Sequence, residues 1–443
     1  MSGTDTNTGK AGAPFKTLGK AFTAVPTGAA VHLLDGTYNA VSEGSAAPLT
    51  VPDGVIVRAE NVRKATIAGL TVAADGTMIS VYDVVFDLGS VLRAKNVAAA
   101  GKVLISGCQF VHRQTSHAVL NVGGLTKLSL TGPLLSGVIS SDAIALADDA
   151  DVAVVGGTID AEGNGQAAFG GGLITINGRA ALSLDGVTMK NSKTPGIIVN
   201  GATAGTSAKL TIKNGTVFDA VGSGGNCASG ASVIALANAT VVVDKATMKN
   251  SPGAALCVRS NAANVSLTVQ NGASLSGNAV GIASELGAGA TAAIAVSDST
   301  LSSNANAAIN WQGAGTISVT GSTMAGNGSA FFLANANPLS VTVRKSAVTG
   351  NGYGLQFFVG DIAGFTIDLG SAASAGANTF TGNTSTSLKI STPSGLTVGA
   401  QGNTWNASVQ GADATGHYGV GTVVTAPGSG TNYQFSNFNT IDF

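Results

Sequence analysis

The chain has 443 residues, and its 22 Lys or Arg and 23 Asp or Glu make up only 10% of them, whereas charged residues supply roughly 25% of an average soluble domain. The net charge is −1, so the protein lacks the basic surplus that neutralises phosphates, and a nucleic-acid partner is excluded. Apolar residues make up 44%, which argues against disorder. Without a stretch of about 18 uninterrupted apolar residues, no transmembrane segment is predicted.

The chain begins with a polar segment, residues 1–12, which we expect to be a flexible leader. It has neither the basic start nor the apolar run of a signal peptide. An initiator Met set directly on a polar leader rich in Gly and Thr looks like a chain cut after its signal peptide, and a mature lipoprotein whose anchoring Cys has been replaced would look the same. A cytosolic protein with a polar N-terminus is the alternative.

Residues 13–30 are predicted to be an N-terminal cap that contains a short helix. Pro14 is compatible with a first helical turn, and the apolar residues that follow have helical spacing, namely Phe15, Leu18, Phe22 and Val25. A cap is expected here because open strand edges at the end of a solenoid invite aggregation.

The start of the chain resembles the opening of right-handed parallel β-helix proteins of the pectate-lyase-like superfamily. The segments that carry the resemblance are AGAPFKTLGKAFTAVPTGAAVHLLDGTYNA and PLTVPDGVIVRAEN. A "PF-T-x-x-A" helix and an "(I/V)-x-(L/V)-x-x-G-x-Y" strand are matched by Pro14, Phe15, Thr17, Ala21, Leu33, Gly36 and Tyr38. The start also resembles that of an uncharacterised family of bacterial, often lipid-anchored, surface proteins. The resemblance implies a fold but no activity, because the superfamily includes lyases, hydrolases, epimerases, adhesins and phage tailspikes.

One phrase recurs along the chain, most regularly from about residue 185 onward: a short alternating strand, a polar turn, and a second apolar strand. The turn positions are 23 to 32 residues apart, which is typical of a β-solenoid whose extra residues bulge out as loops. We therefore predict an all-β fold, a single right-handed parallel β-helix of about a dozen rungs over residues 13–400. The predicted turn residues are Asn191, Asp219, Asn250, Asn278, Asn304, Asn327, Asn351 and Asn383.

Three columns of residues follow these turns. The first and third are mostly apolar and are predicted to face the interior, whereas the mixed column between them faces outward. Stacking also accounts for the shortage of charge, because a charge repeated in successive rungs would lie about 5 Å from its own kind. The first column is Ile197, Leu256, Ile282, Ile309, Phe331, Leu355 and Leu388, the second Ile198, Cys257, Ala283, Asn310, Phe332, Gln356 and Lys389, and the third Val199, Val258, Ser284, Trp311, Leu333, Phe357 and Ile390.

One polar cluster precedes the regular repeat. His112, Arg113 and His117 fall in one predicted turn, and Asp142 follows His117 by 25 residues, about one rung. A His beside a carboxylate can act as a general base while an Arg holds an acidic sugar, so these four residues are the candidate catalytic site. The alternative is an exposed loop whose polar groups bind its own backbone.

Motifs of the carbohydrate-active members of the superfamily are otherwise missing. Galacturonases carry Asn-Thr-Asp, His-Gly and Arg-Ile-Lys segments besides an Asp-Asp pair, and only the pair is present, as Asp148–Asp149 in a predicted solvated turn. No carboxylate trio recurs at rung spacing, so neither a calcium site nor any other metal or cofactor is predicted.

Two of the three cysteines, Cys227 and Cys257, lie 30 residues apart at corresponding places in neighbouring rungs. Adjacent rungs bring Cα atoms to about 5 Å, so we predict a disulfide, and from it an extracytoplasmic location. The alternative is that Cys227 and Cys257 are two unrelated small residues that form no disulfide. Cys108 is expected to be a small packed residue.

Aromatic residues gather in the later rungs. Trp311 and Phe357 belong to the interior columns, whereas Phe332, Tyr353 and Phe358 remain as candidates for an exposed sugar-binding surface. Threonines do not recur at a fixed strand position, so a flat, ice-binding threonine array is not predicted. Residues 401–443 leave the repeat and are predicted to be a C-terminal capping segment, with aromatics that close the last rung: Tyr418, Tyr433, Phe435, Phe438 and Phe443.

The sequence therefore predicts an extracytoplasmic protein, extracellular or associated with the outer surface of the cell, surface-exposed or held by a lipid anchor. Its expected role is structural or adhesive, with a glycan or a cell-surface protein bound without catalysis. In so sparsely charged a chain an active site should stand out, and the one polar cluster found does not, which favours a scaffold. The alternative function is a polysaccharide lyase or glycoside hydrolase with an atypical site at His112, Arg113, His117 and Asp142.

Overall fold

The computed structural model describes most of the chain. The described residues are 3–87, 89–97, 100–111, 118–137, 142–162, 172–201, 207–225, 227, 230–260, 264–334, 338–358, 363–371, 373–391, 397–405, 417–418, 424–425, 431–436 and 440–442.

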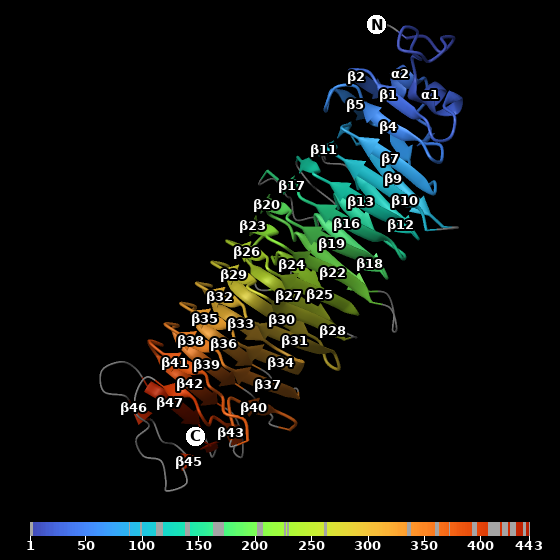
Figure 1. Ribbon diagram of the computed structural model, residues 1–443. Helices are drawn as coiled ribbons and strands as arrows, with labels where there is room; N and C mark the ends of the chain where they lie inside the picture. Colours follow the sequence, from blue (N-terminus) through green and yellow to red (C-terminus); the bar gives the residue numbers. More distant parts are fainter. Residues whose placement is uncertain are drawn as a thin grey trace. The chain divides into compact units, whose positions relative to one another are not determined.

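The chain divides into two compact units, Met1–Thr211 with Gly215–Val217, and Ile212–Asn214 with Phe218–Phe443. Strands β22 (Ala208–Lys213) and β23 (Val217–Val221) contain the boundary. In each unit three parallel sheets surround an apolar interior (Figure 1), so the predicted all-β, right-handed parallel β-helix is confirmed.

In the first unit, successive strands of each sheet come from successive turns of the chain and pair in parallel. The first sheet contains β1 (Ala30–Leu33), β4 (Ile56–Ala59), β7 (Met78–Tyr82), β10 (Lys102–Ser106), β13 (Lys127–Thr131), β16 (Asp151–Val155) and β19 (Ala181–Asp185). The second contains β2 (Gly36–Asn39), β5 (Ala65–Ala68), β8 (Val85–Asp87), β11 (Gln109–Val111), β14 (Leu134–Ser136), β17 (Thr158–Asp160) and β20 (Thr188–Ser192). The third contains β3 (Leu49–Thr50), β6 (Thr71–Ala73), β9 (Val91–Asn96), β12 (Leu120–Gly124), β15 (Ile144–Leu146), β18 (Ile174–Gly178) and β21 (Ile197–Gly201).

The second unit repeats this plan. Its first sheet contains β25 (Ala239–Asp244), β28 (Val265–Gln270), β31 (Thr291–Ser297), β34 (Ala314–Thr320), β37 (Leu339–Arg344), β40 (Thr366–Asp368), β43 (Thr397–Gly399) and β48 (Thr440–Asp442). Its second contains β26 (Thr247–Lys249), β29 (Ser274–Ser276), β32 (Thr300–Ser302), β35 (Thr323–Ala325), β38 (Ala347–Thr349), β41 (Thr379–Thr381) and β44 (Thr404–Trp405). Its third contains β24 (Val233–Ala235), β27 (Ala254–Ser260), β30 (Val280–Leu286), β33 (Ala307–Trp311), β36 (Ser329–Ala334), β39 (Tyr353–Phe358), β42 (Thr386–Ser391) and β47 (Thr431–Ser436).

The N-terminal helix is present but begins later than Pro14. Helix α1 spans Leu18–Ala24, because Thr17 is its N-cap and supplies the side-chain oxygen that accepts a helical N–H. The short helix α2 (Ala40–Glu43) packs beside it, and the Glu43 carboxylate accepts the first two N–H groups of α1 at 2.9 and 3.0 Å. These bonds satisfy donors that a helix start leaves without partners.

The predicted interior columns are confirmed by the register of the third sheet. Leu256 pairs with Ile282, and the same alignment continues rung by rung to Leu388. Trp311 and Phe357 are fully buried in the other interior column. The side chains of the column between them face outward, as the alternation of a strand requires.

A ladder of buried asparagines runs along the second unit. In every member after the first, the side-chain oxygen accepts both the backbone N–H and the Nδ2 of the Asn one rung earlier, at 2.9–3.1 Å. The members are Asn278, Asn304, Asn327, Asn351 and Asn383.

Three other predicted turn residues, Asn191, Asp219 and Asn250, do not belong to this buried ladder, although Asn191 and Asn250 have the left-handed backbone of a turn. Asn250 is exposed with φ of 58°, and the buried Ser251 after it holds the ladder position, donating its N–H to Asn278 Oδ1 at 2.9 Å. Asn is favoured both at left-handed turn positions and in side-chain ladders, so the residue type alone does not distinguish the two.

Residues 401–443 do not leave the repeat altogether. Strands β44, β47 and β48 each add a parallel strand to one sheet, and the Trp405 ring stacks on Phe380 with centroids 4.2 Å apart. Tyr433 and Phe435 align with the interior columns. Only the short strands β45 (His417–Tyr418) and β46 (Val424–Thr425) pair antiparallel, whereas Phe438 and Phe443 lie outside the described residues.

Candidate functional site

The three aromatic residues that the sequence singled out come together on the outer face of the third sheet in the second unit. Phe332 projects from β36, and Tyr353 and Phe358 stand at the two ends of β39. The rings of Phe332 and Phe358 lie with centroids 5.5 Å apart and planes tilted by 42°. All three side chains are half-buried, so each is held by neighbours while part of it contacts solvent.

Lys389 on β42 completes this group, which we call the aromatic patch: Phe332, Tyr353, Phe358 and Lys389. Its Nζ lies 5.2 Å from the Phe358 centroid and 5.9 Å from that of Tyr353. Such cation–π contacts favour an ammonium over the ring face.

The outward column explains why these side chains meet. Phe332, Gln356 and Lys389 are direct register partners in three successive rungs. Gln356 lies between Phe332 and Lys389, and its buried side-chain amide donates a hydrogen bond to Ser329 Oγ at 2.7 Å. Sequence reasoning missed Lys389 as a site residue, although its place in the same column as Phe332 was a usable signal.

The candidate catalytic cluster is not assembled within the described part of the chain. His112, Arg113 and His117 lie outside the described residues. Asp142 is half-buried, and Thr175 Oγ1 of β18 donates to its Oδ1 at 2.6 Å. That bond belongs to the third sheet of the first unit and places the carboxylate against a neighbouring rung.

The Asp148–Asp149 pair lies in a turn, as expected. Asp148 has φ of 60°, and its Oδ2 accepts the N–H of Gly124 at 2.9 Å. Asp149 forms an ion pair with Arg179, whose hydrogen bonds lower the pKa of the Asp149 carboxyl. The two carboxylates therefore have separate partners. Among the described residues, no three His, Cys, Asp or Glu side chains are grouped to hold a metal ion.

The structure contains the Cys227–Cys257 disulfide, with Cα atoms 5.4 Å apart. Both half-cystines are buried in an apolar cluster on the third sheet of the second unit, together with Ala231, Ile234, Ala254, Val280 and Ala283. Cys108 is a buried free thiol whose Sγ contacts the Val81 carbonyl oxygen at 3.7 Å, and burial raises its pKa to about 12. A thiol with this pKa is not a nucleophile near neutral pH.

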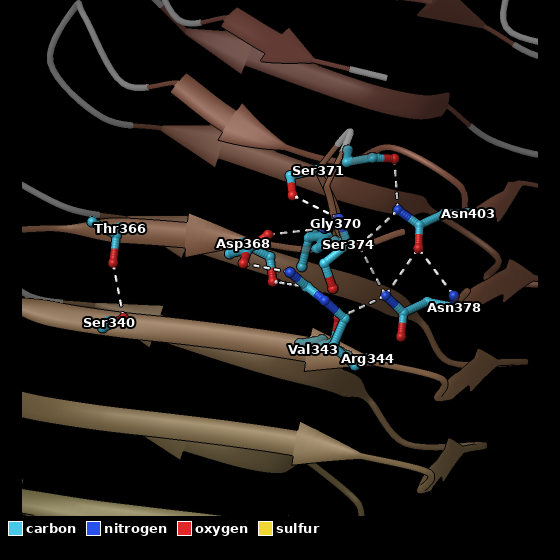
Figure 2. A network of polar contacts seen from close by, with 12 residues as sticks. Ser340, Val343, Arg344, Thr366, Asp368, Gly370, Ser371, Ser374, Asn378 and Asn403 are labelled. Carbon is cyan, nitrogen blue, oxygen red and sulfur yellow. Dashed lines mark hydrogen bonds and ion pairs between the residues drawn. The ribbon is translucent and has the colours of Figure 1, made fainter. Parts of the chain in front are cut away.

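A second polar network lies further along the second unit (Figure 2). Arg344 forms an ion pair with Asp368 and also donates to the Asp368 backbone carbonyl at 2.7 Å. Asn378 donates its N–H and Nδ2 to Asn403 Oδ1 at 3.0 and 2.9 Å. These groups bind one another and the backbone of adjacent rungs, so the network holds the coils together.

The register corrects the expectation that threonines do not recur at a fixed strand position. On the second sheet of the second unit, one outward position is occupied almost throughout by small hydroxyl residues, and cross-strand pairs of this kind stabilise a sheet. The sequence alone did not align them because loops of different length separate the rungs. In register order they are Thr247, Ser274, Thr300, Thr323, Ala347, Thr379 and Thr404.

Comparisons with known proteins show a similarity, over the first part of the chain, to a family without an assigned activity. Residues 1–111 match a family described as "Protein of unknown function (DUF1565)". No curated protein matches the sequence. A solved structure described as a mannuronic acid specific polysaccharide family 6 lyase enzyme from human gut microbiota is 12% identical, with 80% of this chain and 82% of that chain covered and a TM-score of 0.27. That score transfers neither substrate nor activity to this chain.

Among the described helices, none has both the length and the apolar character needed to cross a bilayer.

Proposed function

We propose that this protein is an extracytoplasmic, surface-exposed β-helix protein that binds a glycan, without catalysis, through the aromatic patch. The observation that carries the proposal is the pair of half-buried rings, Phe332 and Phe358, held 5.5 Å apart beside the Lys389 ammonium. Sugar rings stack their C–H faces on aromatic side chains, and an ammonium donates hydrogen bonds to sugar hydroxyls.

The fold supports this role because the patch is built on rigid strands. Phe332 and Lys389 lie on strands that pair with β39 on either side, so their separation is set by the sheet. A site built on strands loses less conformational entropy on binding than one built on loops. The disulfide supports the location, since such bonds persist in oxidising compartments.

A glycan array followed by affinity electrophoresis in the retained polysaccharide tests the proposal. We expect Tyr353→Ala and Phe358→Ala each to weaken binding by about tenfold, because stacked aromatic contacts contribute roughly 1 kcal/mol or more. Tyr82→Ala is the matched control, since Tyr82 is also a half-buried aromatic on a sheet face, in the first unit.

Three outcomes contradict the proposal. Binding that is equal in Phe358→Ala and the control places the glycan elsewhere, and retention of a surface protein with no glycan points to a protein partner. Cleavage of a polysaccharide that disappears in His117→Ala favours the lyase or hydrolase instead.

A further inference from the structure

The first unit carries an exception to the rule that like charges do not stack. Lys102 of β10 and Lys127 of β13 are direct register partners on the outer face of the first sheet. In the strand registers that the structure describes, no other rung sets two like charges opposite each other; charged partners are otherwise of opposite sign, as in Asp160 with Lys190. Like charges directly opposite each other destabilise a sheet, and this chain is otherwise poor in charge.

No ion pair within the described residues joins either lysine to a carboxylate. Both lysines are exposed. Asp151 is the register partner of Lys127 on its other side, but no ion pair joins them. Asp53, in the turn before β4, accepts the N–H of Met78 at 2.8 Å and binds the Thr77 hydroxyl, both in the next rung, and within the described residues no ion pair joins it to either lysine.

Large exposed apolar side chains lie beside the lysine pair. Met78 is the register partner of Lys102 and is 59% exposed. Val97 and Leu125 follow the paired residues Asn96 and Gly124 at the adjoining corner, and they are 73% and 41% exposed. Leu125 donates its N–H to the Asn96 carbonyl at 2.7 Å, which fixes the corner. We call Met78, Val97 and Leu125 the aliphatic shoulder.

This combination is confined to the first unit. All the exposed large hydrophobic side chains of the described residues lie between Val41 and Val155. The corresponding outer face in the second unit carries mainly Ser, Thr and Ala, as in the column Thr240, Ser266, Ala293, Thr316, Ser340 and Thr366. Sheet formation alone therefore does not require the lysines or the aliphatic shoulder.

We propose that this corner of the first unit docks on an anionic phospholipid surface. Lys102 and Lys127 contact headgroup phosphates, while the aliphatic shoulder enters the boundary between headgroups and acyl chains. Charge complementarity favours an anionic partner, because the phosphates remove the repulsion between the two ammonium groups. Aliphatic side chains without an aromatic ring beside them favour lipid over a sugar polymer, and lysine stems can lie along apolar surface while their charges stay in water. This site is separate from the aromatic patch and does not depend on glycan binding.

Co-sedimentation of the full chain with vesicles tests the proposal. We expect binding to vesicles of equal parts phosphatidylcholine and phosphatidylglycerol, no binding to phosphatidylcholine alone, and a loss of binding as salt is added. Lys102→Gln with Lys127→Gln reduces the partition coefficient by about tenfold or more, and Met78→Ser with Leu125→Ser reduces it severalfold at unchanged charge.

The matched control is Lys64→Gln with Lys193→Gln, which removes the same charge from two other exposed positions of the first unit. The proposal is overturned if the wild-type chain binds neither vesicle, or if the control lowers binding as much as the Lys102 and Lys127 pair does. Lysine-dependent binding of soluble dextran sulfate without vesicle binding overturns it as well and identifies a polyanionic glycan instead. Unchanged circular dichroism and thermal midpoints confirm that each variant is folded.

Discussion

Asn327 Oδ1 accepts two hydrogen bonds from Asn304, one from its backbone N–H and one from its Nδ2, both at 2.9 Å. Asn327 in turn donates its own N–H and Nδ2 to Asn351 at 2.9 Å. Each side-chain oxygen thus accepts the buried backbone N–H and Nδ2 of the Asn in the neighbouring rung. The chain of hydrogen bonds runs along the second unit in the direction in which the rungs stack. Buried polar groups in such a network stabilise the structure only while every partner is present.

Asn327→Ala is expected to destabilise the protein by about 3 kcal/mol, because it leaves the Asn304 N–H and the Leu301 carbonyl buried without this partner. Urea unfolding followed by circular dichroism measures the change in unfolding free energy. Asn306→Ala is the control, since Asn306 is exposed in the adjoining turn, and its effect should stay within about 0.5 kcal/mol. Equal effects of the two substitutions would show that the ladder contributes little.

The disulfide is expected to constrain the unfolded chain. Cys227 and Cys257 are 30 residues apart, and closing a loop of this length contributes about 3.6 kcal/mol in the chain-entropy model. Reduction should lower the unfolding free energy by about that amount. The double variant Cys227→Ser with Cys257→Ser should be as unstable without reductant as with it. A wild-type chain whose stability does not respond to reductant would contradict this prediction.

Cys108 should be inert in the folded protein. Burial raises its pKa to about 12, so near neutral pH its thiol is neutral and inaccessible to a reagent. Iodoacetamide is expected to label no cysteine in the native oxidised protein, one after denaturation, and all three after denaturation with reduction. Mass spectrometry counts the adducts. Rapid labelling of Cys108 under native conditions would show that this rung opens.

Acid should weaken the second unit through Asp244. A hydrogen bond from Gln270 lowers the pKa of the Asp244 carboxyl; burial opposes this shift, and a further bond from Asn271 adds to it. Because the folded pKa lies below the unfolded value of about 3.9, the contribution is present above that pH and is lost as pH falls through the folded pKa.

Carboxyl NMR titration measures the Asp244 pKa directly, and urea unfolding between neutral and acidic pH measures its effect. Asp244→Asn is expected to make stability less dependent on pH in the acid range. An Asp244 carboxyl that titrates at or above its ordinary value would refute the prediction.

Much of the second unit could be read from the sequence because loops do not disturb the columns of the third sheet. Trp311, Leu333 and Phe357 occupy the same interior position in successive rungs, and they were aligned correctly from alternation alone. The turn positions were harder. Asn250 and Asn278 look equivalent in sequence, but one needs a left-handed backbone and the other a buried ladder, and both favour Asn.

The sequence by itself determined the parallel β-helix, its interior columns and the neighbouring-rung positions of Cys227 and Cys257, because each follows from the period of two within a strand and from the rung repeat. Only the tertiary structure decided which outward side chains meet. The Lys389 ammonium reaches two aromatic rings, and Lys102 stacks on Lys127, because loops of unequal length bring residues 31 and 25 positions apart into adjacent rungs. Contacts across rungs depend on register and on side-chain orientation. The hydrophobic pattern specifies the register of the interior columns, but where loops differ in length it does not specify which outward side chains touch.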